Sequence, residues 1–147
     1  MLSKTFNVDG RLSGDTEFII DWPLCQVLLM NDARFPWLIL VPRIEDAREP
    51  FDLSESEQTH LWRESMVLGR WMSETFTGDK LNIGMLGNIV AQLHVHHVAR
   101  SVGDSAWPGP VWGSGTAQPY TPTALAEKVA LCQRGLAPEL IFSGSTR

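Results

Sequence analysis

The chain has 147 residues, a length typical of one domain with a sizeable core. Its hydrophobic content of 44% and charged content of 20% exclude a disordered chain. A net charge of −5, with scattered Lys and Arg, argues against a nucleic-acid partner, and the apolar runs are too short for a membrane span. The first residues lack the apolar stretch of a secretory leader. We therefore expect a single domain over residues 1–147 in the cytoplasm.

The two cysteines, Cys25 and Cys132, both lie in apolar surroundings. Such cysteines are commonly buried free thiols, and a disulfide or a reactive thiol is the alternative. Free thiols also agree with a cytoplasmic location.

The first predicted elements are strands. Two apolar runs within Asp15–Met30 are broken at Trp22-Pro23, which predicts two strands or a strongly bent hairpin. The run Trp37–Val41 is continuously apolar and ends at Pro42. This pattern is typical of a central strand with both faces covered.

An amphipathic helix follows an irregular segment, residues 43–53. Ser54 and Glu57 have the spacing of a capping box, and apolar residues then recur at helical intervals to about Thr77. We expect Trp62 and Trp71 to belong to the core.

The next segments, Lys80–Leu86 and Ile89–Arg100, are predicted to be strands joined by a turn. The irregular segment that follows is rich in Gly, Pro and Trp. A second main helix is predicted over about 122–135, because Thr121 is a suitable N-cap and Pro122 would occupy the first helical position.

Three of the four histidines, His94, His96 and His97, fall within four residues. Side chains alternate between the faces of a strand. The side predicted to be open and to face a ligand carries Gln92, His94, His96 and Arg100. The side predicted to pack on the core carries Leu93, Val95, His97 and Ala99.

Two imidazoles at this spacing have Cα atoms about 6–7 Å apart, a separation that fits one phosphoryl group. One ring could attack phosphorus while the other donates a hydrogen bond to an oxygen. Attack by a ring nitrogen would give a covalent nucleotidyl-histidine. Positioning and charge stabilisation can be supplied without a metal or another cofactor.

The segment GNIVAQLHVHHVAR, residues 87–100, resembles the signature of the histidine triad (HIT) superfamily. The alignment puts His94 at the nucleophilic middle position and His96 at the last one, where it would stabilise phosphoryl oxygens or protonate the leaving group. It puts Gln92 where the first histidine usually stands, so the register is Gln-x-His-x-His and Gln92 would hold the geometry of the catalytic residues. His97 falls on an apolar position of the family pattern.

Weaker matches extend the resemblance over roughly residues 15–113. Trp37 stands where relatives carry an additional histidine, and Asn31 matches a residue that contacts ribose. Asn88 stands where relatives carry a glutamine beside the phosphates. Ile89 stands where many relatives carry a Ser or Thr that assists the leaving group.

Several positions keep a structural alternative. Gly87 and Asn88 could form a phosphate-binding turn or a plain tight turn. Arg100 could contact phosphate or form a surface ion pair. His97 and His60 are expected to be structural. Trp107 and Trp112 could stack a base, seal a dimer contact or pack in the core.

The resemblance implies an α+β fold, HIT-like, with a mostly antiparallel sheet of about five strands and two main helices. It implies a homodimer that acts on a small-molecule nucleotide at its α-phosphate, as a hydrolase or a nucleotidyl transferase. Dinucleoside polyphosphates and phosphoramidates are the expected substrate types. A catalytically weak or inactive nucleotide-binding module is the alternative, motivated by Gln92, Trp37 and Ile89. A small metalloprotein is a further one, although His-x-His supplies only two ligands.

Overall fold

The structure, a computed structural model, describes residues 6–143. Its strands are β1 (Thr16–Asp21), β2 (Cys25–Met30), β3 (Trp37–Pro42), β4 (Lys80–Gly84) and β5 (Val95–Arg100). Its α-helices are α1 (Gly10–Gly14), α2 (Glu55–Thr75), α3 (Pro122–Gly135) and α4 (Pro138–Ile141), and a short 3-10 turn spans Pro50–Asp52. The strands form one antiparallel sheet in the order β1-β2-β3-β5-β4. The predicted α+β fold, with five strands and two main helices, is confirmed.

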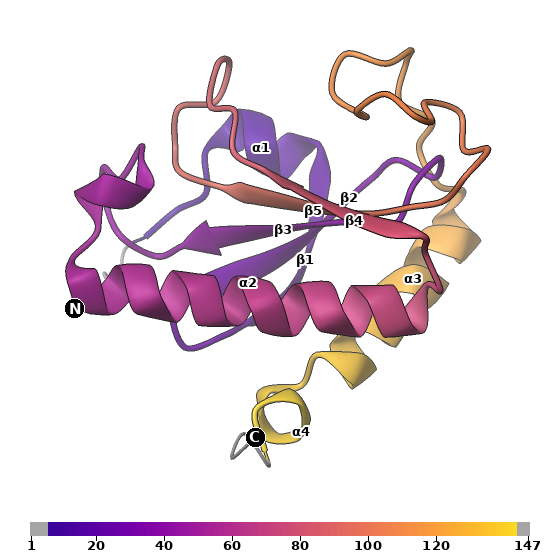
Figure 1. The fold of residues 1–147 in the computed structure, drawn as a ribbon. Helices are drawn as coiled ribbons and strands as arrows, with labels where there is room; N and C mark the ends of the chain where they lie inside the picture. Colours follow the sequence, from indigo (N-terminus) through magenta and orange to yellow (C-terminus); the bar gives the residue numbers. More distant parts are fainter. Residues whose placement is uncertain (1–5, 144–147) are drawn as a thin grey trace.

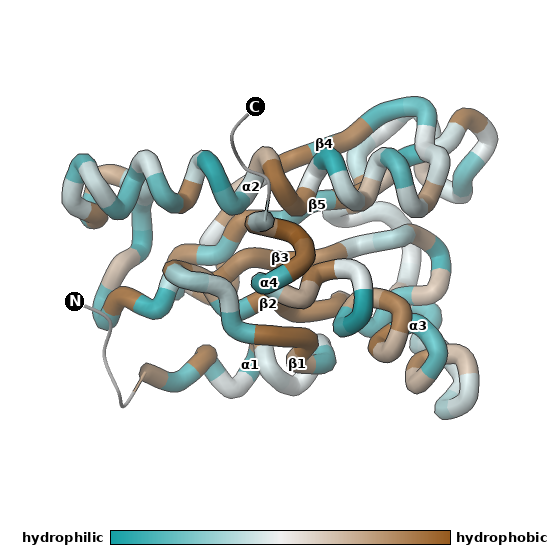
Figure 2. Tube along the Cα trace, turned by 90° about the horizontal axis from the view of Figure 1, so that it is seen from below, coloured by the Kyte–Doolittle hydropathy of each residue, from teal (hydrophilic) through white to brown (hydrophobic). Residues whose placement is uncertain are grey.

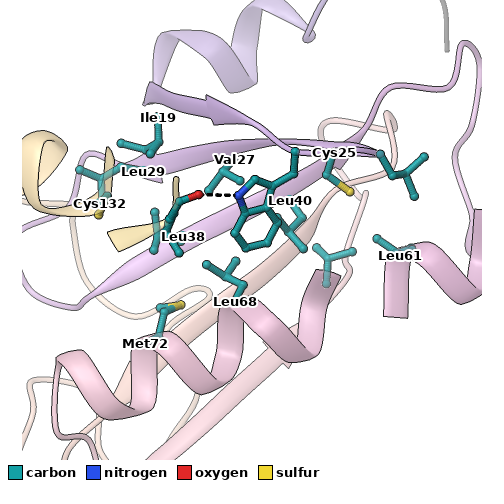
Figure 3. Packing of buried hydrophobic residues seen from close by; sticks show 14 of the residues in the cluster. Ile19, Cys25, Val27, Leu29, Leu38, Leu40, Leu61, Leu68, Met72 and Cys132 are labelled. Atoms are coloured by element: carbon teal, nitrogen blue, oxygen red, sulfur yellow. Dashed lines mark hydrogen bonds between the residues drawn. The ribbon is translucent and has the colours of Figure 1, made fainter. Parts of the chain in front are cut away.

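The helices α2 and α3 cover one face of the sheet, and α1 lies on the other (Figure 1). The main core lies beneath the helix-covered face, where Leu38 and Leu40 of β3 point toward Leu68 and Met72 of α2 (Figure 3). These four side chains are fully buried, and each contributes about 1.5–3 kcal/mol by leaving water.

A second apolar cluster covers the opposite face. Trp37 and Ile39 of β3 meet Leu12 of α1 and Val111 of the long segment after β5. Both faces of β3 are therefore buried, as its apolar run predicts, and β3 occupies the middle of the sheet. In the tube coloured by hydropathy, brown segments gather around β1, β2 and β3, whereas α2 alternates between brown and teal (Figure 2).

Helix α2 begins at the predicted capping box. The Ser54 hydroxyl accepts from the Glu57 amide at 3.1 Å, and the Glu57 carboxylate accepts from the Ser54 amide at 2.8 Å. The prediction for Trp62 is wrong, because its side chain is 64% exposed. The buried stripe of α2 runs through Leu61, Leu68 and Met72, and Trp62 lies about 100° around the helix from Leu61. Trp71 is partly buried against the core.

Strand β5 begins at Val95, so the predicted strand over Ile89–Arg100 is too long. The Leu93 amide donates to the carbonyl of Ala47 at 2.9 Å, which takes the chain out of the ladder just before the strand. The alternation of faces holds from Val95 onward, whereas His94 is positioned by the preceding loop.

The predicted free thiols are confirmed, since Cys25 and Cys132 are both buried and unpaired with each other. Burial raises the pKa of Cys132 to about 11. Within residues 6–143, no helix is long and apolar enough to cross a bilayer. The first five residues, which belong to the stretch assessed for a secretory leader, lie outside the described part.

Candidate active site

The rings of His94 and His96 lie side by side, with centroids 4.8 Å apart and planes at 68°. His96 projects from β5 between Ile39 of β3 and Gly84 of β4, on the face away from α2. Only 7% of His94 and 6% of His96 is exposed. The site is therefore more enclosed than the open face that strand alternation predicts, because the second apolar cluster covers this side of the sheet.

The tautomer of His94 follows from a single hydrogen bond. Its Nδ1 lies 2.6 Å from the backbone carbonyl oxygen of Gln92. A carbonyl only accepts, so Nδ1 carries the hydrogen of the neutral ring and Nε2 keeps its lone pair. No described residue forms a hydrogen bond with this Nε2, which leaves it available as a nucleophile.

His96 has the opposite tautomer. The indole Nε1–H of Trp37 donates to its Nδ1 at 3.0 Å, and an indole N–H can only donate. Nδ1 is therefore unprotonated, and Nε2 of the neutral ring carries the hydrogen. Burial, with a smaller contribution from the neighbouring His94 and His97, lowers the pKa of His96 to about 3, so the ring is neutral at pH 7.

Trp112 completes an aromatic wall around His96. Its ring centroid lies 5.5 Å from that of His96 and 6.4 Å from that of Trp37. The far edge of its indole rests on Gly84, where an added Cβ would lie 2.9 Å from Cη2. Its Nε1 is buried and has no hydrogen-bond partner among the described residues. Of the alternatives for Trp112, packing is the one seen within a single chain.

Gln92 contributes its backbone to the histidines and its side chain to the N-terminal segment. The side-chain Oε1 accepts from the amide of Asp9 at 2.7 Å, and Nε2 donates to the carbonyl of Asn7 at 3.0 Å. Sequence reasoning missed this tether. No local pattern could reveal it, because its partners lie more than 80 residues apart.

The predicted ribose and phosphate contacts lie in loops around the site. The Asn31 side-chain oxygen, just after β2, accepts from the Tyr120 amide at 2.9 Å and so holds the segment before α3. Gly87 has a φ of 71°, as a tight turn requires, and Asn88 beside it is exposed. Neither Asn31 nor Asn88 forms a hydrogen bond with the histidines, and their roles toward a nucleotide stay predictions.

Arg100 requires a correction. Arg100 is 1% exposed, and its guanidinium forms a bidentate ion pair with Asp104 at 2.8 and 2.9 Å, with a further bond to Asn82 at 2.9 Å. The Arg100 partner holds the pKa of Asp104 well below its usual range. Arg100 therefore forms a buried ion pair rather than a surface one, and its contact with a phosphate stays a prediction. Its partners come from β4 and from the loop after β5, which strand alternation cannot show.

The other two histidines lie outside the site. His97 points toward α2, where its Nδ1 donates to the Val95 carbonyl at 3.1 Å and its Nε2 accepts from the Ser65 hydroxyl at 2.7 Å. The prediction that His97 is packed is confirmed. His60 is exposed on α2. Within residues 6–143, no three His, Cys, Asp or Glu side chains gather as a metal site would need.

Comparison with known proteins agrees with this geometry. Residues 11–103 match the HIT domain family. A histidine triad protein from Marinobacter aquaeolei is 47% identical, with a TM-score of 0.85 over 92% of this chain and 96% of that one. One from Bradyrhizobium japonicum is 44% identical, with a TM-score of 0.85 over 88% and 97%.

A more distant structure shares the fold alone. It is the Plasmodium falciparum diadenosine triphosphate hydrolase, which is 15% identical, with a TM-score of 0.58 over 92% of this chain and 83% of that one. No curated protein matches the sequence significantly.

Proposed function

Because the chain belongs to the HIT domain family, we propose that it is a nucleotide hydrolase or nucleotidyl transferase acting at an α-phosphate. The substrate is a nucleoside phosphate derivative of the dinucleoside polyphosphate or phosphoramidate type. The name of the distant structure that shares the fold, a diadenosine triphosphate hydrolase, agrees with this class.

The complementary tautomers of two adjacent rings carry the proposal. His94 offers a lone pair on Nε2, and His96, 4.8 Å away between centroids, offers a hydrogen on Nε2. A nucleophile beside a donor is the arrangement that in-line attack on phosphorus requires. The Gln92 carbonyl holds the first ring and Trp37 holds the second, so both are oriented before substrate arrives.

The reaction proceeds in two displacements. Nε2 of His94 forms a bond to the α-phosphorus while the bond from phosphorus to the leaving group breaks, and the leaving group takes the electron pair. Nε2–H of His96 donates to a phosphoryl oxygen whose charge grows during the step. Water or another acceptor then attacks phosphorus, and the P–N bond breaks to return the lone pair to His94.

The decisive experiment is to trap the nucleotidyl adduct. We expect rapid quenching with a dinucleoside polyphosphate to give a mass increase of one nucleoside monophosphate residue on the peptide containing His94. His94→Ala removes the nucleophile and should lower turnover by at least about 10³-fold without unfolding the protein. His60→Ala, at an exposed position on α2, is the matched control and should keep full activity. Native turnover by His94→Ala contradicts the assignment.

A nucleotide-binding module without turnover is the second candidate. The observation that favours it is the low exposure of both rings, 7% and 6%. It predicts that calorimetry detects binding of a nucleoside monophosphate while no adduct forms with any nucleotidyl donor. An adduct on His94 excludes it.

The expected homodimer is also a proposal. Strand β4 is an edge of the sheet, and Ile83 and Met85 beside that edge are exposed, which a second copy of the chain would cover. Sedimentation velocity should give the mass of two chains, and Ile83→Glu should shift the protein toward monomer. A monomer at high concentration contradicts the proposal.

A further inference from the structure

We propose that Trp37 is a specificity-determining positioning residue: it fixes His96 as a neutral donor, so the site favours leaving groups that depart without receiving a proton. The inference rests on the proposed function, because it concerns the leaving group of the same displacement. Trp37 does not touch the reacting atoms and acts only through His96.

The hydrogen bond from Trp37 occupies the one nitrogen at which neutral His96 could gain a proton. Its Nδ1 lone pair accepts the indole N–H at 3.0 Å, so protonation would break that bond. The ring also packs against both Trp37 and Trp112, with centroids 5.7 and 5.5 Å away, and neither neighbour can accept a proton. Imidazolium is therefore disfavoured by the contacts themselves.

The low pKa of His96 agrees with this geometry. A pKa of about 3 leaves on the order of one ring in ten thousand charged at pH 7. Burial is the main cause of this low pKa, and the neighbouring titratable rings of His94 and His97 also contribute to it. A neutral Nε2–H stabilises a phosphoryl oxygen by hydrogen bonding, but its own proton is too weakly acidic to be transferred.

His94 cannot supply the missing proton. Its hydrogen is on Nδ1 and is bound to the Gln92 carbonyl at 2.6 Å, on the other side of the ring from the attacking Nε2. After attack the ring is positively charged, yet that hydrogen stays against a carbonyl. The leaving atom therefore gains no proton from either ring.

The absence of a proton donor for the leaving atom on either ring distinguishes two kinds of substrate. In a phosphoanhydride the P–O bond breaks and the leaving phosphate takes the electron pair as a stable anion, so no proton is needed. In a phosphoramidate of an alkylamine the P–N bond must break, and the amine leaves only after its nitrogen is protonated. Such a proton would have to come from solvent, which the enclosed site restricts.

The first test measures the dependence of rate on the leaving group with the native protein. A series of nucleoside 5′-aryl phosphodiesters, spanning phenols from acidic to weakly acidic, should show kcat/KM falling steeply as the pKa of the phenol rises. A dinucleoside polyphosphate should exceed an alkyl phosphoramidate of the same nucleoside by at least about 100-fold in kcat/KM, a ratio set by proton transfer in the transition state. A flat series, or an equal rate for the phosphoramidate, overturns the inference.

The second test reads the tautomer directly. In ¹⁵N NMR spectra, the Nδ1 of His96 should have the shift of an unprotonated nitrogen and Nε2 that of a protonated one, unchanged between pH 5 and pH 9. Trp37→Phe keeps an aromatic ring but removes the N–H, so both neutral tautomers should appear and the leaving-group dependence should become shallower. Titration of native His96 within this range overturns the inference, and so does an unchanged tautomer in folded Trp37→Phe.

The outcomes separate this inference from the proposed function. Absence of turnover with every substrate, together with absence of an adduct on His94, overturns the proposed function and this inference with it. Turnover through a His94 adduct with a flat leaving-group series overturns this inference alone. If Trp37→Phe does not fold, the native spectra and the native substrate series still decide the matter.

Discussion

His96 and His97 are adjacent on β5 and face opposite sides of the sheet, and they differ in how many of their ring nitrogens form hydrogen bonds within the protein. His96 and His97 are both buried, and burial lowers the pKa of each, to about 3 and about 4. On the α2 side both ring nitrogens of His97 are bonded within the protein. On the other side only Nδ1 of His96 is bonded, to Trp37, and no described residue bonds its Nε2. Burial and pKa therefore do not distinguish His96, the proposed catalytic residue, from the packed His97, whereas the ring nitrogen without a hydrogen-bond partner does.

Removing each of the two rings in turn tests this difference most directly. We expect His96→Ala to lower kcat by about 10²–10³-fold, because it deletes the donor to the phosphoryl oxygen. His97→Ala should leave kcat of the folded protein unchanged but lower the free energy of unfolding by about 2–4 kcal/mol, since it leaves a cavity and an unpaired Ser65 hydroxyl. Steady-state kinetics and urea unfolding of both variants give the two values. The reverse pattern would show that the two sides are wrongly assigned.

The next effect is a loss of stability in acid. The folded-state pKa of His97, about 4, lies below the ordinary value of 6.5, so below pH 6.5 the unfolded chain binds a proton that the folded chain does not. The stabilisation is complete above pH 6.5 and is lost as the pH falls toward 4. Between pH 7 and pH 5 we expect His97 to account for about 2 kcal/mol of the fall in unfolding free energy, with a similar share from His96.

Urea unfolding at the two pH values measures this fall. The acid loss should be smaller in His97→Ala than in the native protein, and His60→Ala should behave like the native protein. An equal loss in native protein and His97→Ala would show that His97 titrates normally.

A smaller effect is expected when only the partner of His97 is removed. Ser65→Ala leaves Nε2 of His97 buried without a donor, which should lower the unfolding free energy by about 1–2 kcal/mol. Ser73→Ala, at an exposed position of the same helix, is the matched control and should change little. Equal stability of the two variants would contradict the account of the α2 side.

The smallest effect concerns the aromatic wall on the opposite side. Gly84→Ala would place a Cβ 2.9 Å from Trp112, so the indole must shift away from His96. We expect a loss of about 1 kcal/mol in unfolding free energy and an altered near-ultraviolet circular dichroism spectrum. Gly10→Ala, with no atom within 4 Å of the added Cβ, is the control. An unchanged spectrum would show that Trp112 does not rest on Gly84.

Local and long-range features of the chain differ in how far sequence predicts them. The capping box at Ser54 and the central strand beginning at Trp37 depend on residues close together in the sequence, and both are confirmed. The start of β5 depends on a bond between Leu93 and Ala47, so periodicity places it too early. The exposure of Trp62 could be predicted from its position around the helix, since Leu61 and Leu68 define the buried stripe of α2. The hydrophobicity of Trp62 alone suggests the core instead.

The site shows the same division. The spacing of His94 and His96 is sufficient to suggest that they act together, and the structure places their rings side by side, although His94 lies in the loop before β5 and not on the strand. The bond that sets the tautomer of His96 comes from Trp37, which is 59 residues away and meets β5 only through sheet pairing. The ion pair of Arg100 likewise depends on how the loop after β5 returns to the strand.

The Gln92 tether has a practical consequence for shortened forms of the protein. The matched family region begins at residue 11, whereas the backbone that occupies both ends of the Gln92 amide belongs to Asn7 and Asp9. A version trimmed to that boundary would keep every strand, but the side-chain amide of Gln92 would lose both protein partners and be hydrated instead. Gln92 would then be held less firmly, and its backbone carbonyl is the group that orients His94. Weak activity of such a version would therefore reflect the loss of Asn7 and Asp9 and not the catalytic capacity of the longer chain.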